Sequence, residues 1–361
     1  MLRFTVLSHR PGHTAAAFIK EFASCLSLLR TVHRSSAGQP FILSGSGTLG
    51  WDLIAANLCE RGHKALVVNT GYFSDSFADC LQTYGVEVAQ VKCAEVGQSV
   101  DDEQLRAALQ ANPSLQLVVL TQVDTSTAVL NDIKGMAALV RASQPDAFIA
   151  VDGVCSFGGE EFLFDEWGID AAMSCSQKAL GAPPGLSTLL LSPRALKFVQ
   201  EGRKTPIPTF FGSLLRWLPV MRAYEAEQPS YFATPNTSLI RALEVSLRSI
   251  VEYGLEARWA DHVAHSNAFK AAMTAIGLRQ LAEPHRRANT LSAVYYPDDI
   301  DTSRFLGTVS KHFTHTSLHM QRTGRRSICP PLTALFARVP VVPGAVVRRH
   351  MRGRTAQGRQ S

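Results

Sequence analysis

Residues 41–200 alternate between two patterns, and this alternation restricts the fold more than any other feature of the chain. Stretches with apolar residues at three- and four-residue spacing indicate helices, and short, almost wholly apolar runs separate them. The expected helices are 50–60, 75–84, 102–111 and 132–142, and the apolar runs are 65–68, 86–91, 115–120, 147–151 and 187–191. Strands that are apolar on both faces belong in a sheet covered on both sides. The alternation therefore predicts a mostly parallel, doubly wound α/β domain, in which ligands gather at the carboxyl ends of the strands.

The rest of the chain predicts a second, smaller α/β domain, because a chain of 361 residues usually divides into two. Residues 205–231 are too irregular for one element, and a long helical stretch over 238–277 follows, with a break near Gly254. A strand-like run over 291–297 and a helix-like run over 302–311 open the smaller domain. We expect a large domain over 1–237, a smaller domain over 238–340 that is atypical after about 312, and a disordered basic tail over 341–361.

Composition excludes several classes of protein. The hydrophobic share of 46% and the charged share of 18% are those of an ordinary globular protein. No apolar run approaches the roughly 20 residues that span a bilayer, so we expect no membrane partner. The seven cysteines form no CxxC pair and no zinc-like spacing, which indicates a reducing compartment and gives no support to a metal site.

The net charge of +6 is unevenly distributed. Residues 301–361 hold ten Arg and one Lys against Asp301, a net charge of +10, so residues 1–300 carry −4. The basic tail has no repeated aromatic or groove-reading pattern, so we expect no nucleic-acid partner. Residues 1–13 are basic and lack a long apolar stretch, which excludes a secretory signal and leaves a mitochondrial presequence open. We expect a cytoplasmic location, with the peroxisome or the mitochondrion as alternatives.

The first candidate catalytic residue is Lys178, which follows a short apolar segment and precedes a Pro/Gly turn over 181–185. A lysine between a strand and a rigid turn is held with few degrees of freedom. Lysine suits Schiff-base chemistry because burial and nearby cations lower its pKa and free its lone pair. Taken alone, the residue is better interpreted as a surface lysine in a loop.

The second candidate is Asp152, at the end of the apolar run 147–151 and followed by small residues. A carboxylate there faces the crevice at the edge of the sheet. Pyridoxal 5′-phosphate (PLP) needs such a carboxylate against its pyridine nitrogen, because a protonated nitrogen makes the ring an electron sink. A helix cap or a turn cap is the alternative interpretation of Asp152 alone.

The third candidate is the Gly/Ser-rich turn over 43–48, which leads into the helix expected from about Gly50. Such a turn offers backbone N–H groups and the positive end of the helix dipole to a phosphate. As a single motif it is weak evidence, because many helices begin with Gly and Ser.

Taken together, residues 41–240 resemble the class V aminotransferases, specifically the alanine–glyoxylate/serine–pyruvate aminotransferase branch. The interval between Asp152 and Lys178 also fits the spacing in this family. The stretches that carry the resemblance are GSGTLGWDLIAANL (45–58), NTGYFSD (69–75), TQVDTSTAVLND (121–132), VDGVCSFGGEEF (151–162), WGIDAAMSCSQKALGAPPG (167–185) and YFATPNT (231–237). The resemblance implies the PLP-transferase type I architecture, with PLP as the cofactor.

The resemblance also implies roles for individual residues. Lys178 would hold PLP as a Schiff base and move a proton between the substrate α-carbon and the cofactor, and Asp152 would pair with the pyridine nitrogen. The remaining cofactor contacts would be Val154 beside the ring, Phe73 stacked on it, Thr125 on the phenolic oxygen, and Gly47, Thr48 and Gln177 on the phosphate. Tyr231 and Thr234 would reach the phosphate of the neighbouring subunit, which implies a homodimer. Core packing for Phe73 and a plain cap for Thr125 are the alternative interpretations.

The resemblance weakens at both ends of the chain. The Gly/Pro-rich segment that opens the family is apparently shortened here, since the chain begins almost directly with a helix over 14–32. The family pattern stops at about His312, and the arginine that binds the substrate α-carboxylate through a bidentate fork is not found. Arg338 is a poor substitute because Pro340 follows it where the family has glycine. We therefore expect PLP to bind well and amino acids to bind poorly.

Two functions follow. The first is an aminotransferase that moves an amino group from a small amino acid (alanine, serine) to a 2-oxo acid (glyoxylate, pyruvate), or a copy recruited to specialised metabolism such as the precursors of a peptide toxin. The second is a catalytically impaired relative that keeps the fold and PLP binding. A desulfurase is disfavoured, because it needs a nucleophilic cysteine on a mobile loop, whereas Cys155 and Cys175 are expected to be packed small residues.

Overall fold

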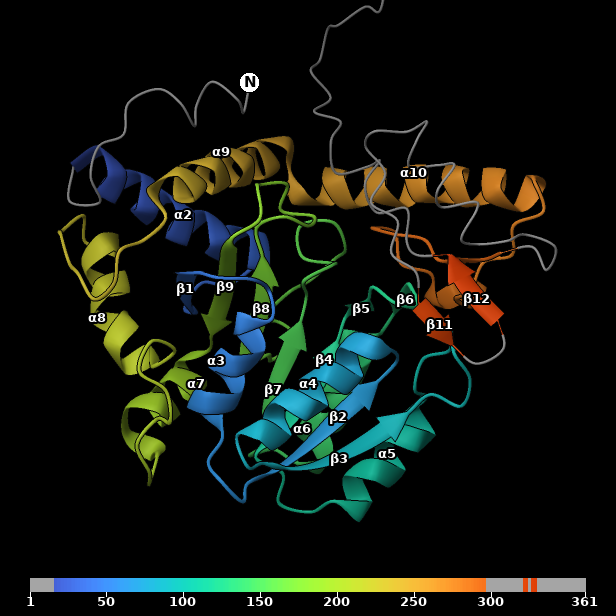
Figure 1. The fold of residues 1–361 in the computed structure, drawn as a ribbon, viewed down its shortest axis with the longest axis horizontal. Coiled ribbons are helices and arrows are strands. Elements are labelled where there is room, and N and C mark those ends of the chain that lie inside the picture. Colours follow the sequence, from blue (N-terminus) through green and yellow to red (C-terminus); the bar gives the residue numbers. More distant parts are fainter. Residues whose placement is uncertain (1–15, 297–320, 324–325, 330–361) are drawn as a thin grey trace, which may run out of the picture.

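The computed structural model describes residues 16–296, 321–323 and 326–329. Its centre is a seven-stranded sheet with the strand order β1-β9-β8-β7-β4-β2-β3 (Figure 1). The strands are β1 (Gln39–Ser44), β2 (Lys64–Asn69), β3 (Glu87–Lys92), β4 (Leu117–Thr121), β7 (Phe148–Asp152), β8 (Ala171–Cys175) and β9 (Leu186–Leu191). Strand β9 is antiparallel to β1 and β8, and the four remaining pairs are parallel. The carboxyl ends of β4, β7 and β8 therefore lie side by side.

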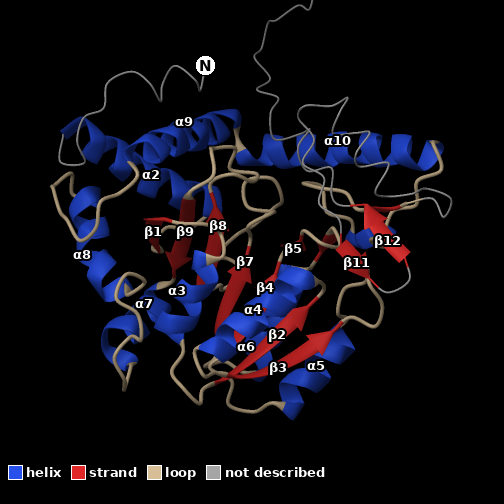
Figure 2. Ribbon diagram, viewed as in Figure 1, coloured by secondary structure: helices blue, strands red, loops and turns tan. Residues whose placement is uncertain are grey.

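Helices cover both faces of the sheet (Figure 2). The α-helices of the described residues are α2 (Ala16–His33), α3 (Leu49–Leu58), α4 (Tyr72–Thr83), α5 (Asp102–Ala111), α6 (Ile133–Ser143), α7 (Pro193–Lys197), α8 (Leu214–Glu225), α9 (Thr237–Tyr253) and α10 (Leu255–Ala275). On β2, Ala65 and Val67 pack in the cluster that contains α3 and α4, whereas Leu66 and Val68 pack in the cluster that contains α5 and α6. The alternation of side chains along one strand thus fills two cores, which is the doubly wound arrangement that the sequence predicts.

Smaller elements complete the described chain. A two-stranded ribbon of β5 (Val123–Asp124) and β6 (Val129–Leu130) follows β4, and a three-stranded antiparallel sheet joins β10 (Val294–Tyr295), β12 (Arg326–Cys329) and β11 (Gln321–Thr323). Helices α9 and α10 run end to end along one side of the molecule, and α2 packs beside α9 (Figure 1). In the described part of the chain, no helix is long and apolar enough to cross a membrane.

The expected helices and strands of residues 41–200 are confirmed to within a few residues, and α2 corresponds to the helix expected over 14–32. The break near Gly254 is also confirmed: α9 ends at Tyr253, α10 begins at Leu255, and Gly254 has a φ of 92°, which favours glycine.

Two expectations about local structure are wrong. Strand β3 is not apolar on both faces, because it lies at the edge of the sheet and its residues are half-buried or exposed. Residues 205–231 are, as expected, not one element: they contain the helix α8, whose internal Pro219 obscures its pattern, between irregular segments. The strand expected over 291–297 is only Val294–Tyr295. The helix expected over 302–311 and the tail over 341–361 lie outside the described residues, and the domain boundary at 237/238 stays a prediction.

Candidate active site

Asp152 ends β7 at the centre of the carboxyl edge of the sheet, where it pairs in register with Thr121 of β4 and Met173 of β8. Its side chain is buried, with 4% of the residue exposed. The indole Nε1–H of Trp51 donates to Oδ2 at 2.8 Å, and the backbone N–H of Val154 donates to Oδ1 at 3.0 Å. Two neutral donors thus hold both carboxylate oxygens and leave lone pairs on each for a ligand.

Burial raises the pKa of Asp152 to about 6, and the hydrogen bonds from Val154 and Trp51 oppose that rise. Asp124 raises this pKa further through charge repulsion. Above pH 6 the group is therefore mostly ionised in spite of its burial. An ionised, buried carboxylate without a cationic hydrogen-bond partner in the described chain is suited to a positively charged ligand atom.

Lys178 is half-buried in the turn that follows β8. Backbone and side-chain bonds fix the turn: Gly181 N–H donates to Lys178 O at 2.9 Å, and Ser176 Oγ donates to Pro183 O at 2.7 Å. Gly181 has a φ of 74°, where a residue with a β-carbon is strained. The expectation of a lysine held between a strand and a rigid turn is confirmed as geometry.

Arg258 of α10 ties the Lys178 turn to the loop that follows Asp152. Its Nη2 donates to Ala179 O at 2.9 Å and its Nε donates to Gly158 O at 2.5 Å. Burial lowers the pKa of the Arg258 guanidinium. A largely buried arginine that donates to carbonyls of two site loops fixes their relative position.

The Gly/Ser-rich turn meets the same two segments. Gly45 N–H donates to Gly185 O at 2.9 Å, which joins the turn to the Pro/Gly segment after Lys178. A β-carbon at Gly47 would lie 3.2 Å from Val154 Cγ2 and 3.4 Å from Cys175 Cβ. The absence of a side chain at Gly47 therefore lets the turn lie directly against the Asp152 loop and against β8.

The side chains near this turn keep polar groups available for a ligand. Thr48 precedes α3 as its N-cap residue, and its exposed side chain makes no capping bond. The Oε1 atom of Gln177 is buried and has no hydrogen-bond partner among the described residues. A buried amide oxygen without a partner is costly, so a bound group that donates to Gln177 or reorients it fits this position.

Phe73 lies in the first turn of α4 and Thr125 in the turn after β5, and Asp124 holds these two segments together. Asp124 is fully buried and accepts hydrogen bonds from Ser74 and Ser126, both through the backbone N–H and through Oγ. Phe73 is half-buried, with its ring centroid 6.4 Å from that of Trp51. The hydroxyl of Thr125 lies 2.6 Å from Cys155 Sγ, so Thr125 contacts the Asp152 loop and is not a plain cap.

Tyr231 and Thr234 are close to each other, with the Tyr231 hydroxyl 3.3 Å from Thr234 Oγ1. Both are exposed, and Tyr231 has 63% of its surface accessible. A large aromatic residue this exposed at a loop is available to a second subunit. The structure contains one chain, so the shared-site role of the two residues stays a prediction.

The two cysteines of the site are buried thiols. Burial raises the pKa of Cys155, and it raises the pKa of Cys175 to about 12. The positive charge of Lys178 opposes both shifts without reversing them. Since the thiolate is the nucleophile, neither group is suited to a desulfurase, in agreement with the prediction from the sequence.

Trp51 and Arg258 contact the site but were not predicted from the sequence. Trp51 stands inside the GSGTLGWDLIAANL stretch, yet its partner Asp152 lies 101 residues later. Only the packing of α3 on the sheet brings Trp51 and Asp152 together. Arg338, the weak candidate for the substrate carboxylate, lies outside the described residues.

Comparisons with known proteins identify the family. The sequence model for "Aminotransferase class-V" matches residues 4–312, so the family pattern ends where the sequence reading placed its end, at His312. The chain is 45% identical over 307 residues to alanine–glyoxylate aminotransferase 1 of Saccharomyces cerevisiae, covering 82% of this chain and 79% of that protein. It is 30% identical over 284 residues to serine–glyoxylate aminotransferase of Methylorubrum extorquens, covering 77% and 69%.

Solved structures agree with the sequence comparisons. The crystal structure of alanine–glyoxylate aminotransferase from Nostoc sp. superposes with a TM-score of 0.84 at 27% identity, over 93% of this chain and 87% of that one. An aspartate aminotransferase of Thermus thermophilus gives 0.80 at 25% identity, over 93% and 91%. The protein therefore belongs to the class V aminotransferases and is a PLP-dependent transaminase with the type I fold.

Proposed function

We propose that the protein transfers the amino group of a small amino acid, alanine or serine, to a 2-oxo acid, glyoxylate or pyruvate. The observation that carries this proposal is the convergence of Asp152, the Lys178 turn and the Gly47 turn at one edge of the sheet. The choice of substrates rests on the relatives, which include the yeast alanine–glyoxylate and the Methylorubrum serine–glyoxylate aminotransferases.

PLP, when bound, supplies an aldehyde that accepts the amino group and a ring that takes up electrons. The residues present fit this group. Gly47, Thr48 and Gln177 would hold the phosphate, because the turn lacks a blocking β-carbon, Thr48 makes no capping bond, and the Thr48 hydroxyl and the side-chain N–H groups of Gln177 can donate to phosphate oxygens. Phe73 would pack on the ring, Val154 would lie beside it, and Thr125 would bind its phenolic oxygen.

The two catalytic residues would divide the chemistry. Asp152, ionised above about pH 6, would keep a proton on the pyridine nitrogen by charge attraction. Lys178 Nζ would bond the cofactor between turnovers and move a proton at the substrate α-carbon during them. The rigid turn around Lys178 would orient its amine, which reduces the entropy cost of the proton transfer.

We also propose a homodimer in which Tyr231 and Thr234 complete the partner's phosphate site. Their exposure and mutual contact support this role. Light scattering on the PLP-loaded protein tests it: we expect twice the 39.3 kDa chain mass. An active, PLP-loaded monomer contradicts it.

Half-transamination tests the proposed function. L-Alanine added without a 2-oxo acid should remove the absorbance of the Lys178 Schiff base, and glyoxylate should restore it. The alternative, a catalytically impaired relative, predicts stable absorbance that neither compound alters. We expect a high Michaelis constant for L-alanine, because the arginine that binds the substrate carboxylate in the family is not found in the sequence. A low-millimolar constant with vigorous turnover would show that an unidentified arginine serves.

A further inference from the structure

Trp51 connects the phosphate-binding turn to Asp152. It stands in the first turn of α3, three residues after Thr48, and its backbone N–H donates to Thr48 O at 3.0 Å. Its side chain is 7% exposed and donates to Asp152 Oδ2 at 2.8 Å. One residue therefore contacts the two points at which the proposed function places opposite ends of the cofactor.

The position of Trp51 is fixed on several sides. Its ring stacks on Phe77 of α4, with centroids 5.6 Å apart and an interplanar angle of 22°. The preceding residue, Gly50, lies against Met173, since a β-carbon there would meet Met173 Cε at 2.4 Å. Met173 is the β8 residue in register with Asp152. The indole N–H is thus aimed at the carboxylate by the packing of α3 on the sheet.

An indole is also the chemically suitable donor for this carboxylate. It donates one hydrogen bond and carries no charge, so it orients Asp152 without neutralising it. An arginine or lysine in the same place would form an ion pair with Asp152 and weaken its attraction for a protonated pyridine nitrogen.

We propose that Trp51 is a positioning residue, which holds the carboxylate of Asp152 at a fixed place relative to the phosphate-binding turn so that one cofactor molecule engages both. This inference rests on the proposed role of Asp152. It adds a residue that touches neither the reacting atoms nor the substrate but acts through Asp152.

Trp51→Phe keeps an aromatic ring against Phe77, removes the donor to Asp152 and makes the side chain smaller. Loss of a hydrogen bond to a charged group should raise the dissociation constant for PLP about 10- to 100-fold and lower kcat by a similar factor. The Michaelis constant for L-alanine should change less than about threefold, because the proposal has Trp51 act through Asp152 and not on the substrate. The matched control is Trp167→Phe, since Trp167 Nε1 is buried with no hydrogen-bond partner among the described residues. The control should bind PLP like the unmodified protein.

The pH dependence of PLP binding separates positioning from general packing. Asp152 interacts electrostatically with Asp124, Cys155 and Cys175. The positive charge of Lys178 also acts on both cysteines. Since the Trp51 hydrogen bond favours the ionised carboxylate, its loss should move the fall in PLP affinity from near pH 6 to higher pH. Trp167→Phe should leave that midpoint in place.

A measurement on the unmodified apoprotein covers the case in which Trp51→Phe does not fold. Tryptophan emission should titrate near pH 6, because the Trp51 ring contacts the carboxylate that gains the proton, and Asp152→Asn should abolish this titration. A PLP dissociation constant for folded Trp51→Phe within twofold of the original, or emission that does not titrate, overturns the proposal. Lack of transamination by the unmodified enzyme would contradict the proposed function but would leave both readouts intact.

Discussion

Thr125 Oγ1 lies 2.6 Å from Cys155 Sγ, so the residue proposed to bind the phenolic oxygen of PLP contacts the loop that follows Asp152. Cys155 is 3% exposed and packs with Val123 and Ala128 of the β5–β6 ribbon. The thiol therefore sets the position of Thr125 and is not itself a reactive group.

This relationship predicts a graded response at residue 155. Cys155→Ser, which keeps a hydrogen-bonding group, should leave kcat within about threefold. Cys155→Ala should raise the activation free energy of turnover by about 0.5–1.5 kcal/mol, the contribution of one hydrogen bond. Because burial raises the thiol pKa, iodoacetamide should modify Cys155 in the native protein far more slowly than in urea. Rapid labelling of native Cys155 with loss of activity would contradict a structural role.

Lys178→Ala should abolish the Schiff-base absorbance and turnover, while PLP still binds without a covalent bond. The Asp152 and Gly47 contacts do not depend on the lysine side chain, so that residual binding should be measurable by equilibrium dialysis. Borohydride reduction of the unmodified enzyme followed by peptide mapping should place the pyridoxyl group on Lys178. Its recovery on another lysine would refute the assignment.

Arg258→Ala should disturb both catalytic loops at once, because the side chain donates to Gly158 O and Ala179 O. Each carbonyl left without a partner costs about 1–3 kcal/mol, and we expect kcat to fall at least about tenfold. Arg258→Lys should restore part of the activity, since one ammonium cannot donate in the same fork to both carbonyls. Arg248→Ala, which removes an exposed arginine of α9 that pairs with Glu244, is the control. Equal effects of Arg258→Ala and Arg248→Ala on kcat would show that the hydrogen bonds of Arg258 to Gly158 O and Ala179 O have no role in catalysis.

The sequence predicted what depends on local pattern. The near neighbours of Lys178 and Asp152 made them candidates, and the resemblance to the family implied their roles. The buried strands are visible in the sequence as apolar runs. Trp51 and Arg258 were missed because their partners lie 101 and 79–100 residues away. Strand β1 was missed because it has only three consecutive apolar residues and takes its place in the sheet by pairing with distant β9. Interactions that only the assembled sheet creates leave no periodic signal along the chain.

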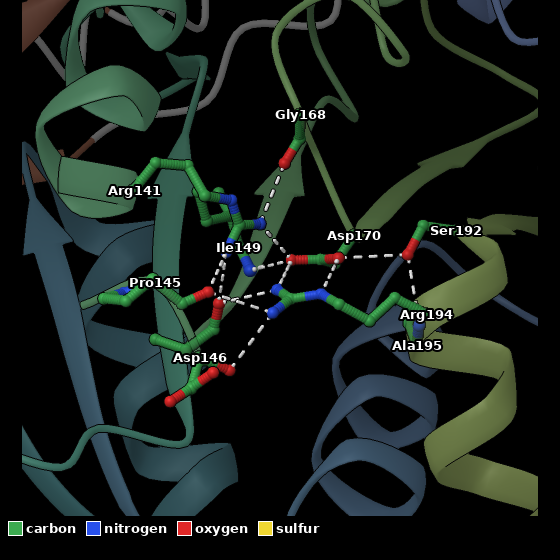
Figure 3. Close-up of polar contacts among 10 residues, drawn as sticks. Arg141, Pro145, Asp146, Ile149, Gly168, Asp170, Ser192, Arg194 and Ala195 are labelled. Carbon is green, nitrogen blue, oxygen red and sulfur yellow. Dashed lines mark hydrogen bonds and ion pairs between the residues drawn. The ribbon is translucent and has the colours of Figure 1, made fainter.

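Asp170 should stabilise the fold without affecting the site, because it lies beside the amino ends of β7 and β8, whereas Asp152 lies at the carboxyl end of β7. It is 3% exposed and accepts from Ile149 N–H, Ser192 Oγ, Arg141 and Arg194 (Figure 3). Asp170→Asn leaves two arginines with a neutral partner. We expect the free energy of unfolding to fall by about 2–4 kcal/mol. This is less than for a wholly buried ion pair, because the Arg194 side chain is 41% exposed.

Urea unfolding measures this loss, and Asp146→Asn is the control, an exposed carboxylate of the same cluster whose backbone oxygen accepts from Arg194. The PLP affinity of folded Asp170→Asn should be unchanged. A shift in PLP affinity with no loss of stability would show that the cluster acts on the site instead.

His33, at the end of α2, should make the protein sensitive to acid. Its ring is 2% exposed and lies edge-on to Phe157, with centroids 4.8 Å apart, while Nδ1 contacts Leu29 O at 2.8 Å. Burial lowers its pKa from 6.5 to about 4. Below pH 6.5 the unfolded chain binds a proton that the folded chain does not, so stability is lost as the pH falls from about 6.5 to 4, by up to about 3 kcal/mol.

Asp152 acts in the opposite direction, because its pKa is raised from 3.8 to about 6 and its protonation favours the folded state over the same range. The pH dependence of the free energy of unfolding therefore does not isolate the effect of His33. The quantity to measure is the difference between the unmodified protein and a His33 variant. The free energy of unfolding of His33→Gln should fall less steeply between pH 6.5 and 4 than that of the unmodified protein. The exposed His285, changed to Gln, should leave the slope as it was. Parallel curves for the unmodified protein and His33→Gln would mean that His33 is protonated in the folded state at no cost.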